Sequence, residues 1–272
     1  MQIISKSYLL ILFILVFGSA SADQQIHTGD VILIPLNKNE ISYKYYYKNH
    51  LLTAVRKDDA PYLLFGIPYN SKKGINTFTF IAKENTKTVK LNIVKKNFDI
   101  QNIKLNKNKK KSQKELDRIY RERREIMDAK KIKYDSYPDY NFIIPVEGIV
   151  TGVYGTQRYY NGIKGNYHNG HDIAADTGTP IYAPSNGKII LTGHYFYNGK
   201  FVMVNHGNNL ISLFLHMDDI HVTEGSLVKK GQIIGSVGNT GLSTGPHLHW
   251  SVLLNNNYVD PLALVNNIKG QT

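Results

Sequence analysis

Histidine and aspartate residues in the second half of the chain have the types and spacing of a metal site. His247 and His249 flank Leu248 at the start of an apolar run. Because successive side chains of a strand point to opposite faces, the two imidazoles would share one face while Leu248 packs on the other. His168 and Asp172 lie four residues apart, an even offset that also places them on one face of an extended segment.

This set of donors suits zinc. Gly170, between His168 and Asp172, disfavours a helix there. The chain has no cysteine, so imidazole and carboxylate groups are the ligands available to a metal ion. Two imidazoles and one carboxylate are typical of catalytic zinc, which keeps its fourth position open for water. We therefore predict a zinc hydrolase that binds one Zn²⁺ per chain through His168, Asp172 and His249.

Two more histidines have positions suited to proton transfer. His216 ends a predicted strand at 211–216, and His247 shares the face of His249. A neutral imidazole can take a proton from a metal-bound water, and a protonated one can stabilise a developing oxyanion. We expect His216 and His247 to be the catalytic pair, with the division of the two roles left open.

The remaining histidines of this half are predicted to lie outside the site. Of the ten histidines in the chain, eight follow position 160. His171 directly precedes Asp172 and is the alternative ligand to His168, but its odd offset from His168 places it on the opposite face of a regular strand, so His168 is favoured. Structural or surface positions near turns are expected for His194, His206 and His221.

Residues 138–267 must position these side chains, and their sequence pattern predicts β-strands throughout. Predicted turns at 186–187, 198–199 and 230–231 separate the strands, and no helical pattern interrupts them. This half is therefore expected to be an antiparallel β domain with one face exposed as a substrate groove. Its strands are predicted at 149–154, 173–175, 181–183, 188–192, 201–205, 211–216, 233–237 and 248–253.

Residues 23–105 also show short strands, and they predict a small β-sandwich. Apolar or alternating segments occur at 31–34, 41–47, 62–67, 75–82 and 89–94. No cluster of histidines or acids marks a catalytic site here. An accessory or spacer domain is the simpler interpretation, and the alternative is that its tyrosine-rich strand at 41–47 binds a glycan or covers the catalytic cleft.

Residues 106–137 are predicted to form a helical connector. Ser112 and Glu115 match a capping box, with Ser112 as the N-cap. A helix of about five turns should follow and end before Ser136. A solvated surface explains its basic face better than nucleic-acid binding does. The apolar residues expected to form one stripe are Leu116, Ile119, Tyr120, Ile126 and Met127.

The first 22 residues match a secretory signal peptide. Lys6 precedes ten apolar residues, and Ala20-Ser21-Ala22 provides a cleavage site. The mature protein would then lie in the periplasm or cell envelope without a transmembrane segment; an uncleaved anchor is the alternative. Loss of Lys6 lowers the formal net charge from +12 to +11. That charge favours polyanionic partners, although a coding bias toward lysine explains it equally well.

The chain resembles the lysostaphin-type (LytM-like) zinc metallopeptidases, which cut the peptides of bacterial peptidoglycan. The resemblance covers about residues 145–263 and implies zinc ligands at His168, Asp172 and His249 and a catalytic pair at His216 and His247. Residues 23–137 resemble, more loosely, the N-terminal half of secreted Gram-negative members. The resemblance lies in three ordered motifs, HNGHDIAADTGTPIYAPSNG, VNHGNNLISLFLH and VKKGQIIGSVGNTGLSTGPHLHW.

Three positions qualify the resemblance. Phe214 stands where family members often have tyrosine, which we interpret as a packing difference. Leu242 stands where arginine is common, so a substrate contact there is in doubt. Arg158 is a candidate substrate or groove residue, and a structural role fits it equally well.

Two alternatives to a freely active enzyme accompany this interpretation. The first is a non-catalytic regulator that binds and activates a cell-wall amidase, as degenerate relatives do; the intact set of five site residues argues against it. The second is autoinhibition, in which the N-terminal domain or the helical connector occludes the groove.

Overall fold

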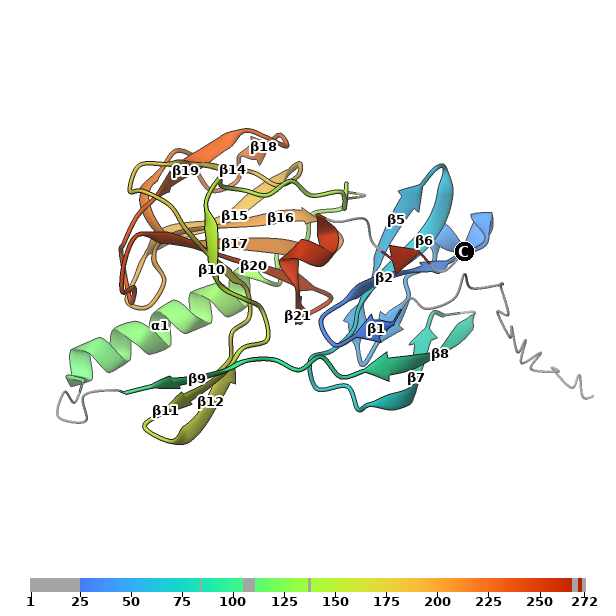
Figure 1. The fold of residues 1–272 in the computed structure, drawn as a ribbon. Helices are drawn as coiled ribbons and strands as arrows, with labels where there is room; N and C mark the ends of the chain where they lie inside the picture. The colour runs from blue at the N-terminus through green and yellow to red at the C-terminus, as the bar shows by residue number, and fades with distance from the viewer. Residues whose placement is uncertain (1–24, 84, 105–110, 137, 266–268, 271–272) are drawn as a thin grey trace, which may run out of the picture.

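The computed structural model describes residues 25–83, 85–104, 111–136, 138–265 and 269–270, so the predicted signal peptide at 1–22 lies outside the described residues. Strands make up about half of the described residues, and α1 (Gln113–Ala129) is the single α-helix among them (Figure 1). No helix in the described ranges is long and apolar enough to cross a membrane. The predicted mainly β fold is confirmed.

The N-terminal part forms the predicted sandwich of two sheets. Edge-to-face rings hold the sheets together, since Phe65 lies 5.1 Å from Phe78 and 5.0 Å from Phe80 between ring centroids. The first sheet has the order β1 (Ile26–His27), β8 (Thr86–Val94), β7 (Gly74–Ile81), β3 (Tyr46–Tyr47) and β4 (His50–Leu51). The second has the order β22 (Lys269–Gly270), β2 (Val31–Pro35), β6 (Ala60–Gly66) and β5 (Thr53–Lys57).

The second sheet of the sandwich is buried on both faces. Ile32 and Ile34 point into the sandwich core, whereas Val31 and Leu33 belong to the same apolar core as Trp250 of the C-terminal part. This alternation follows from the two-residue period of a strand, and it explains why β2 reads as an unbroken apolar run. The N-terminal sandwich and the C-terminal part therefore share one core; the predicted boundaries at residues 105 and 137 stay predictions.

The C-terminal part is built on a ten-stranded sheet whose strand pairs are all antiparallel, as predicted. Its main path runs β10 (Ile149–Gly152), β13 (His171–Ala174), β20 (His247–Leu254), β17 (Leu210–Ile220), β16 (Gly199–Gly207), β15 (Gly187–Tyr195) and β18 (Leu227–Val228). Off this path lie β14 (Pro180–Tyr182), β19 (Ile233–Val237) and β21 (Asn257–Val259), and η2 (Pro261–Leu264) is a short 3-10 helix.

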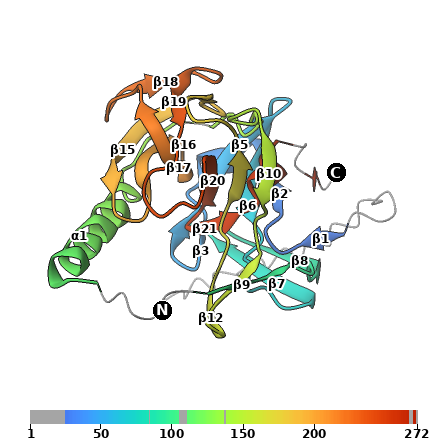
Figure 2. The same ribbon diagram turned by 60° about the vertical axis from the view of Figure 1, so that its left-hand side comes forward.

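A small three-stranded sheet joins the two parts, and the sequence did not reveal it. It has the order β12 (Ile163–Tyr167), β11 (Gln157–Tyr160) and β9 (Ile100–Ile103). β9 is parallel to β11, with Gln101 beside Arg158. Figures 1 and 2 both place this sheet below the large sheet, at the point where the chain leaves the sandwich.

Helix α1 begins where the sequence predicted, and the face that it buries only partly matches the predicted stripe. Ser112 is the N-cap and accepts a hydrogen bond from the Glu115 amide, as a capping box requires. The predicted stripe is partly wrong, because Tyr120 and Met127 are exposed while Glu122 is buried. The buried Glu122 carboxylate is stabilised by polar rather than apolar contacts, because it accepts hydrogen bonds from the backbone amide of Phe196 and from Arg118.

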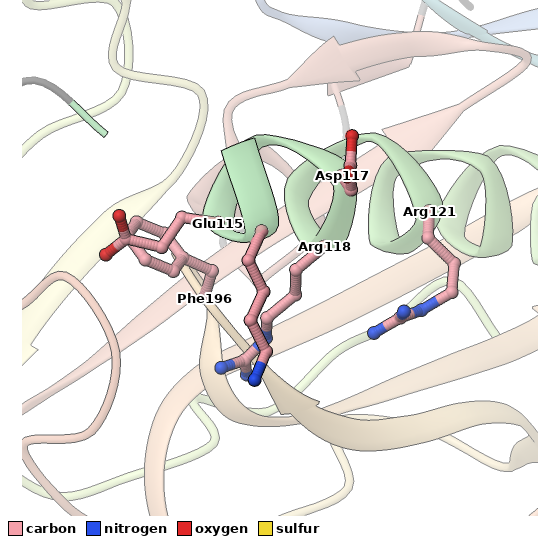
Figure 3. A pocket seen from close by; sticks show the side chains of 6 residues that line it. Glu115, Asp117, Arg118, Arg121 and Phe196 are labelled. Atoms are coloured by element: carbon pink, nitrogen blue, oxygen red, sulfur yellow. The ribbon is translucent and has the colours of Figure 1, made fainter. Parts of the chain in front are cut away.

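The surface pocket drawn in Figure 3 lies beside α1. Phe196 and five helix residues line it, and none of the predicted site residues does. The side chain of Arg118 is already engaged with Glu122 and with the carbonyl of His194. This pocket is therefore separate from the predicted chemistry.

The predicted strand at 41–47 is wrong for most of its length. Residues Lys38–Ser42 form a 3-10 helix (η1), and β3 covers two residues of the predicted segment. The Glu40 carboxylate accepts a hydrogen bond from the Asn37 amide, which closes the chain into a turn before any strand can start. Tyr45 is fully buried, with its hydroxyl accepting from Asn85, so this tyrosine serves the sandwich core.

Candidate metal centre

Three predicted ligands converge in the large sheet. The distances are 3.0 Å from His168 Nε2 to Asp172 Oδ1, 2.7 Å from His249 Nδ1 to Asp172 Oδ1, and 3.1 Å between His168 Nε2 and His249 Nδ1. Donor atoms around one tetrahedral zinc lie about 3.3 Å apart when each bond is about 2.0 Å. The triangle of atoms therefore fits a zinc ion after small outward shifts of the side chains.

Strand register explains why Asp172 and His249 meet. β13 and β20 are antiparallel neighbours, and Asp172 lies directly opposite His249. Leu248 and Trp250 alternate with His249 and are fully buried in the core behind the sheet. The predicted separation of imidazole and apolar faces along residues 247–250 is confirmed.

His168 reaches the same point from the segment between β12 and β13. Its Nδ1 lies 3.0 Å from the Val153 carbonyl, which can only accept, so Nδ1 carries the proton. The lone pair of Nε2 is therefore directed at Asp172 and His249. A carbonyl that fixes the tautomer of a metal-binding histidine in this way is a common outer-shell arrangement.

The protonation states of the cluster suit a cation. Burial raises the pKa of Asp172, but the neighbouring imidazoles of His168 and His249 outweigh this and hold the pKa well below its usual range. Burial lowers the pKa of His249, and the Asp172 carboxylate offsets only part of that change. An ionised carboxylate beside a neutral imidazole is the state that metal binding needs.

The two predicted catalytic histidines lie beside the cluster. The ring centroids of His216 and His247 are 4.8 Å apart, and His247 Nε2 is 3.8 Å from Asp172 Oδ1. Their Nδ1 atoms lie 2.9 Å and 2.8 Å from the carbonyls of Thr240 and Gly245. Both rings therefore carry a proton on Nδ1, and Nε2 is the atom left for chemistry.

Burial lowers the pKa of His216 to about 4, more than the Thr240 carbonyl raises it. The His216 imidazole is therefore neutral at pH 7 and able to accept a proton.

β17 changes partners at His216. Leu215 pairs with His249 of β20, whereas Met217 pairs with Val237 of β19. His216 itself has a φ of +64°, which is uncommon for a residue other than glycine. The sequence signalled the end of an apolar run at His216, but the strand continues past it, and the turn at this residue directs the imidazole toward the cluster.

The other histidines lie away from the cluster. His171 points to the opposite face, as predicted, and its Nε2 lies 2.7 Å from Asp260 Oδ1. His206 is buried between the Asn186 carbonyl and the Ser212 hydroxyl, each at 2.8 Å. His194 and His221 are exposed.

Of the three positions that qualified the resemblance, one contacts the cluster. Arg158 Nη2 lies 3.5 Å from Asp172 Oδ2. Phe214 is fully buried opposite Trp250, in agreement with a packing role, and Leu242 is exposed. The backbone acceptors Val153, Thr240 and Gly245 were not foreseen, because a carbonyl gives no signal in the side-chain sequence.

Comparisons with known proteins agree with this arrangement. Residues 166–261 match the model of Peptidase family M23. The chain is 42% identical over 87 residues to the peptidoglycan DD-endopeptidase ShyA of Vibrio cholerae, which is 32% of this chain and 20% of ShyA. It is 38% identical over 104 residues to lysostaphin of Staphylococcus staphylolyticus, 38% of this chain and 22% of lysostaphin. The chain thus spans about a fifth of the length of the curated relatives it matches.

A solved structure matches almost the whole chain. The crystal structure of an M23-type peptidase from Pseudomonas aeruginosa has a TM-score of 0.72 and 31% sequence identity, and it covers 89% of this chain and 96% of its own. The similarity therefore includes the N-terminal sandwich as well as the residues around the cluster. On these grounds the chain belongs to peptidase family M23.

Proposed function

We propose that this protein is a zinc-dependent endopeptidase that hydrolyses peptide bonds in the cross-links or stem peptides of peptidoglycan. The observation that carries the proposal is the meeting of His168 Nε2, Asp172 Oδ1 and His249 Nδ1 within 3.1 Å of one another. Family membership and the relatives named as peptidoglycan DD-endopeptidases support the substrate class.

In this proposal the cluster supplies the metal chemistry. His168, Asp172 and His249 would hold the ion, and bound zinc polarises a carbonyl and activates a water molecule. The donor set leaves a position open, because three protein ligands are typical of catalytic rather than structural zinc.

His216 and His247 would move the protons. With Nδ1 held by a backbone carbonyl, each ring offers Nε2 to the reacting atoms. A neutral ring can accept a proton from water, and once charged it can stabilise the developing oxyanion or protonate the leaving amine. The pair shares these roles, and a substrate groove above it stays a prediction.

The organisation of the chain around this activity is also proposed. Residues 1–22 would direct export to the periplasm or cell envelope and be removed, and residues 138–267 would carry the chemistry. The N-terminal β domain (23–105) and the helical connector (106–137) would support it. Autoinhibition by the N-terminal domain stays a prediction.

Digestion of purified peptidoglycan sacculi tests the proposal. We expect zinc-loaded protein to release muropeptides whose masses, by mass spectrometry, correspond to cleavage of one defined peptide bond. A chelator should abolish release and added zinc should restore it. Protein that binds zinc but releases nothing, while stimulating a cell-wall amidase, would instead support the regulator alternative.

A further inference from the structure

The two carboxylate oxygens of Asp172 have different surroundings. Oδ1 faces the three imidazoles, at 3.0 Å from His168 Nε2, 2.7 Å from His249 Nδ1 and 3.8 Å from His247 Nε2. Oδ2 faces away from them and forms an ion pair with Arg158 Nη2 at 3.5 Å. The carboxylate therefore has one oxygen toward the metal centre and one toward a guanidinium.

The backbone of β10 closes the space around Oδ2. Gly152 lies opposite Asp172 in the strand register, at a β-bulge. A Cβ atom at Gly152 would lie 2.5 Å from Oδ2, closer than side-chain contacts allow. Oδ2 thus lies between the backbone of β10, where only glycine leaves space for it, and the Arg158 guanidinium.

Arg158 is itself held by the segment that leaves the N-terminal sandwich. Its Nε lies 3.1 Å from Gln101 Oε1, and the two residues are neighbours in the parallel pair of β9 and β11. The Arg158 side chain is 27% exposed, so solvent screens the ion pair only in part. A chain from Gln101 through Arg158 to Asp172 therefore connects β9 to the metal centre.

We infer that Arg158 is a positioning residue that holds Asp172 Oδ2, so that Oδ1 alone binds the metal ion and a coordination position stays open for water. The inference rests on the proposed zinc site. If both oxygens bound the ion, the carboxylate would occupy the position that catalytic zinc keeps for solvent. Gln101 of β9 keeps the guanidinium in place, so β9 helps to position a metal ligand of the C-terminal half.

An opposing effect makes the inference testable. A guanidinium near a divalent cation repels it, so removal of Arg158 could strengthen zinc binding through charge alone. Loss of an outer-shell partner that orients a ligand instead weakens metal binding, typically by about 10–100-fold. The two effects have opposite signs, and the positioning role requires that the second one dominates.

The zinc affinity of the full chain, measured by competition with a chromogenic chelator, distinguishes charge repulsion from positioning. We expect Arg158→Gln to weaken zinc binding by about 10-fold or more. Arg158→Lys should recover part of the loss, because an ammonium can pair with Oδ2 but lacks the planar fork with which the guanidinium also reaches Gln101. Lys164→Gln is the matched control, since it removes one positive charge from the exposed side of the same hairpin and should leave the affinity unchanged.

Replacing Zn²⁺ with Co²⁺ gives a visible spectrum that reports on the ligands of the ion. This spectrum would not change on substitution of Arg158 if that residue served only the stability of the fold. We expect Arg158→Gln to shift the visible absorption of bound Co²⁺, because Oδ2 becomes free to take the coordination position that solvent otherwise occupies. Gln101→Ala should shift affinity and spectrum in the same direction by a smaller amount. This variant keeps the test valid should Arg158→Gln fail to fold, which circular dichroism of the metal-free proteins reveals.

Unchanged or tighter zinc binding by folded Arg158→Gln, or an unchanged Co²⁺ spectrum, would overturn the positioning role. Asp172→Ala separates this failure from failure of the proposed site. If Asp172→Ala keeps zinc, the site itself is wrong; if it loses zinc while Arg158→Gln keeps it, only the role of Arg158 is wrong.

Discussion

His216 and His247 face each other with ring centroids 4.8 Å apart, and both have Nδ1 within 2.9 Å of a backbone carbonyl. They come from strands that pair side by side, β17 and β20. The shared tautomer leaves two Nε2 atoms available beside the candidate metal ligands. This arrangement fits the proposed role of His216 and His247 in proton transfer.

Replacement of either member of the pair should separate catalysis from metal binding. We expect His247→Ala and His216→Ala to keep one zinc per chain by elemental analysis. Their rates of muropeptide release should fall by about 10²–10⁴-fold, the range of general acid–base contributions. His194→Ala, an exposed histidine on β15, is the control and should keep the full rate. A fully active His247→Ala would remove His247 from the mechanism.

Replacement of the carboxylate should instead remove the metal. Asp172→Ala deletes the group that lies within 3.0 Å of both imidazole donor atoms. We expect its zinc content after dialysis to fall close to zero, because the loss should exceed the about 100-fold cost of removing an outer-shell partner. Asp176→Ala, an exposed aspartate four residues further on, should keep one zinc per chain. Equal zinc contents for the two variants would contradict the assignment.

His206 should make the folded state sensitive to acid. Burial lowers the pKa of His206 to about 4, although the Asn186 carbonyl opposes this change. Between this value and the unfolded pKa of about 6.5, the unfolded chain binds more protons at this residue. The free energy of unfolding should therefore fall as the pH drops through this window, by at most about 1.4 kcal/mol per pH unit from this group.

The variant His206→Gln isolates that contribution. In zinc-saturated protein, its free energy of unfolding should change less between pH 7 and pH 5 than that of the wild type, as measured by denaturant titration. It should also be less stable at pH 7, because the buried hydrogen bonds change. The exposed His194→Gln variant should follow the wild-type pH dependence, and a slope for His206→Gln equal to the wild-type slope would refute the prediction.

The shared core should couple the N-terminal sandwich to the stability of the peptidase half. Leu64 of β6 is fully buried in the same core as Trp250, the single tryptophan of the chain. We expect Leu64→Ala to lower the free energy of unfolding followed by Trp250 fluorescence by about 2–5 kcal/mol. Ile75→Ala, 79% exposed on β7, should change it by less than about 0.5 kcal/mol. A Trp250 transition unaffected by Leu64→Ala would show that the halves unfold independently.

For the same reason, residues 138–272 alone should not unfold cooperatively. They would expose the core face that Val31, Leu33, Val55 and Leu64 cover. The Asn255 side chain, which bonds to Thr53 and to the Leu64 carbonyl, would also lose its partners. Comparison of that fragment with the full chain therefore does not measure autoinhibition.

Much of the site could be predicted because its signals are local. The alternation of residues along β20 places His247 and His249 on one face whatever its neighbouring strands are. The Ser112–Glu115 pair likewise marks the start of a helix by itself. The strands around them were predicted for the same reason. In α1, prediction failed where a contact distant in the sequence decided the structure. Glu122 is buried because the Phe196 amide meets it, which no helical period reveals.

The sequence by itself determined the mainly β class, the five site residues that the structure brings together and the start of α1, because each depends on residue type and short spacing. Only the tertiary structure decided that β9 lies parallel to β11, that Arg158 pairs with Oδ2 of Asp172, and that one sheet of the sandwich packs into two cores. These features depend on segments tens of residues apart meeting at one place. Long-range pairing of this kind follows from the closing of the whole core, and no periodicity within a single segment encodes it.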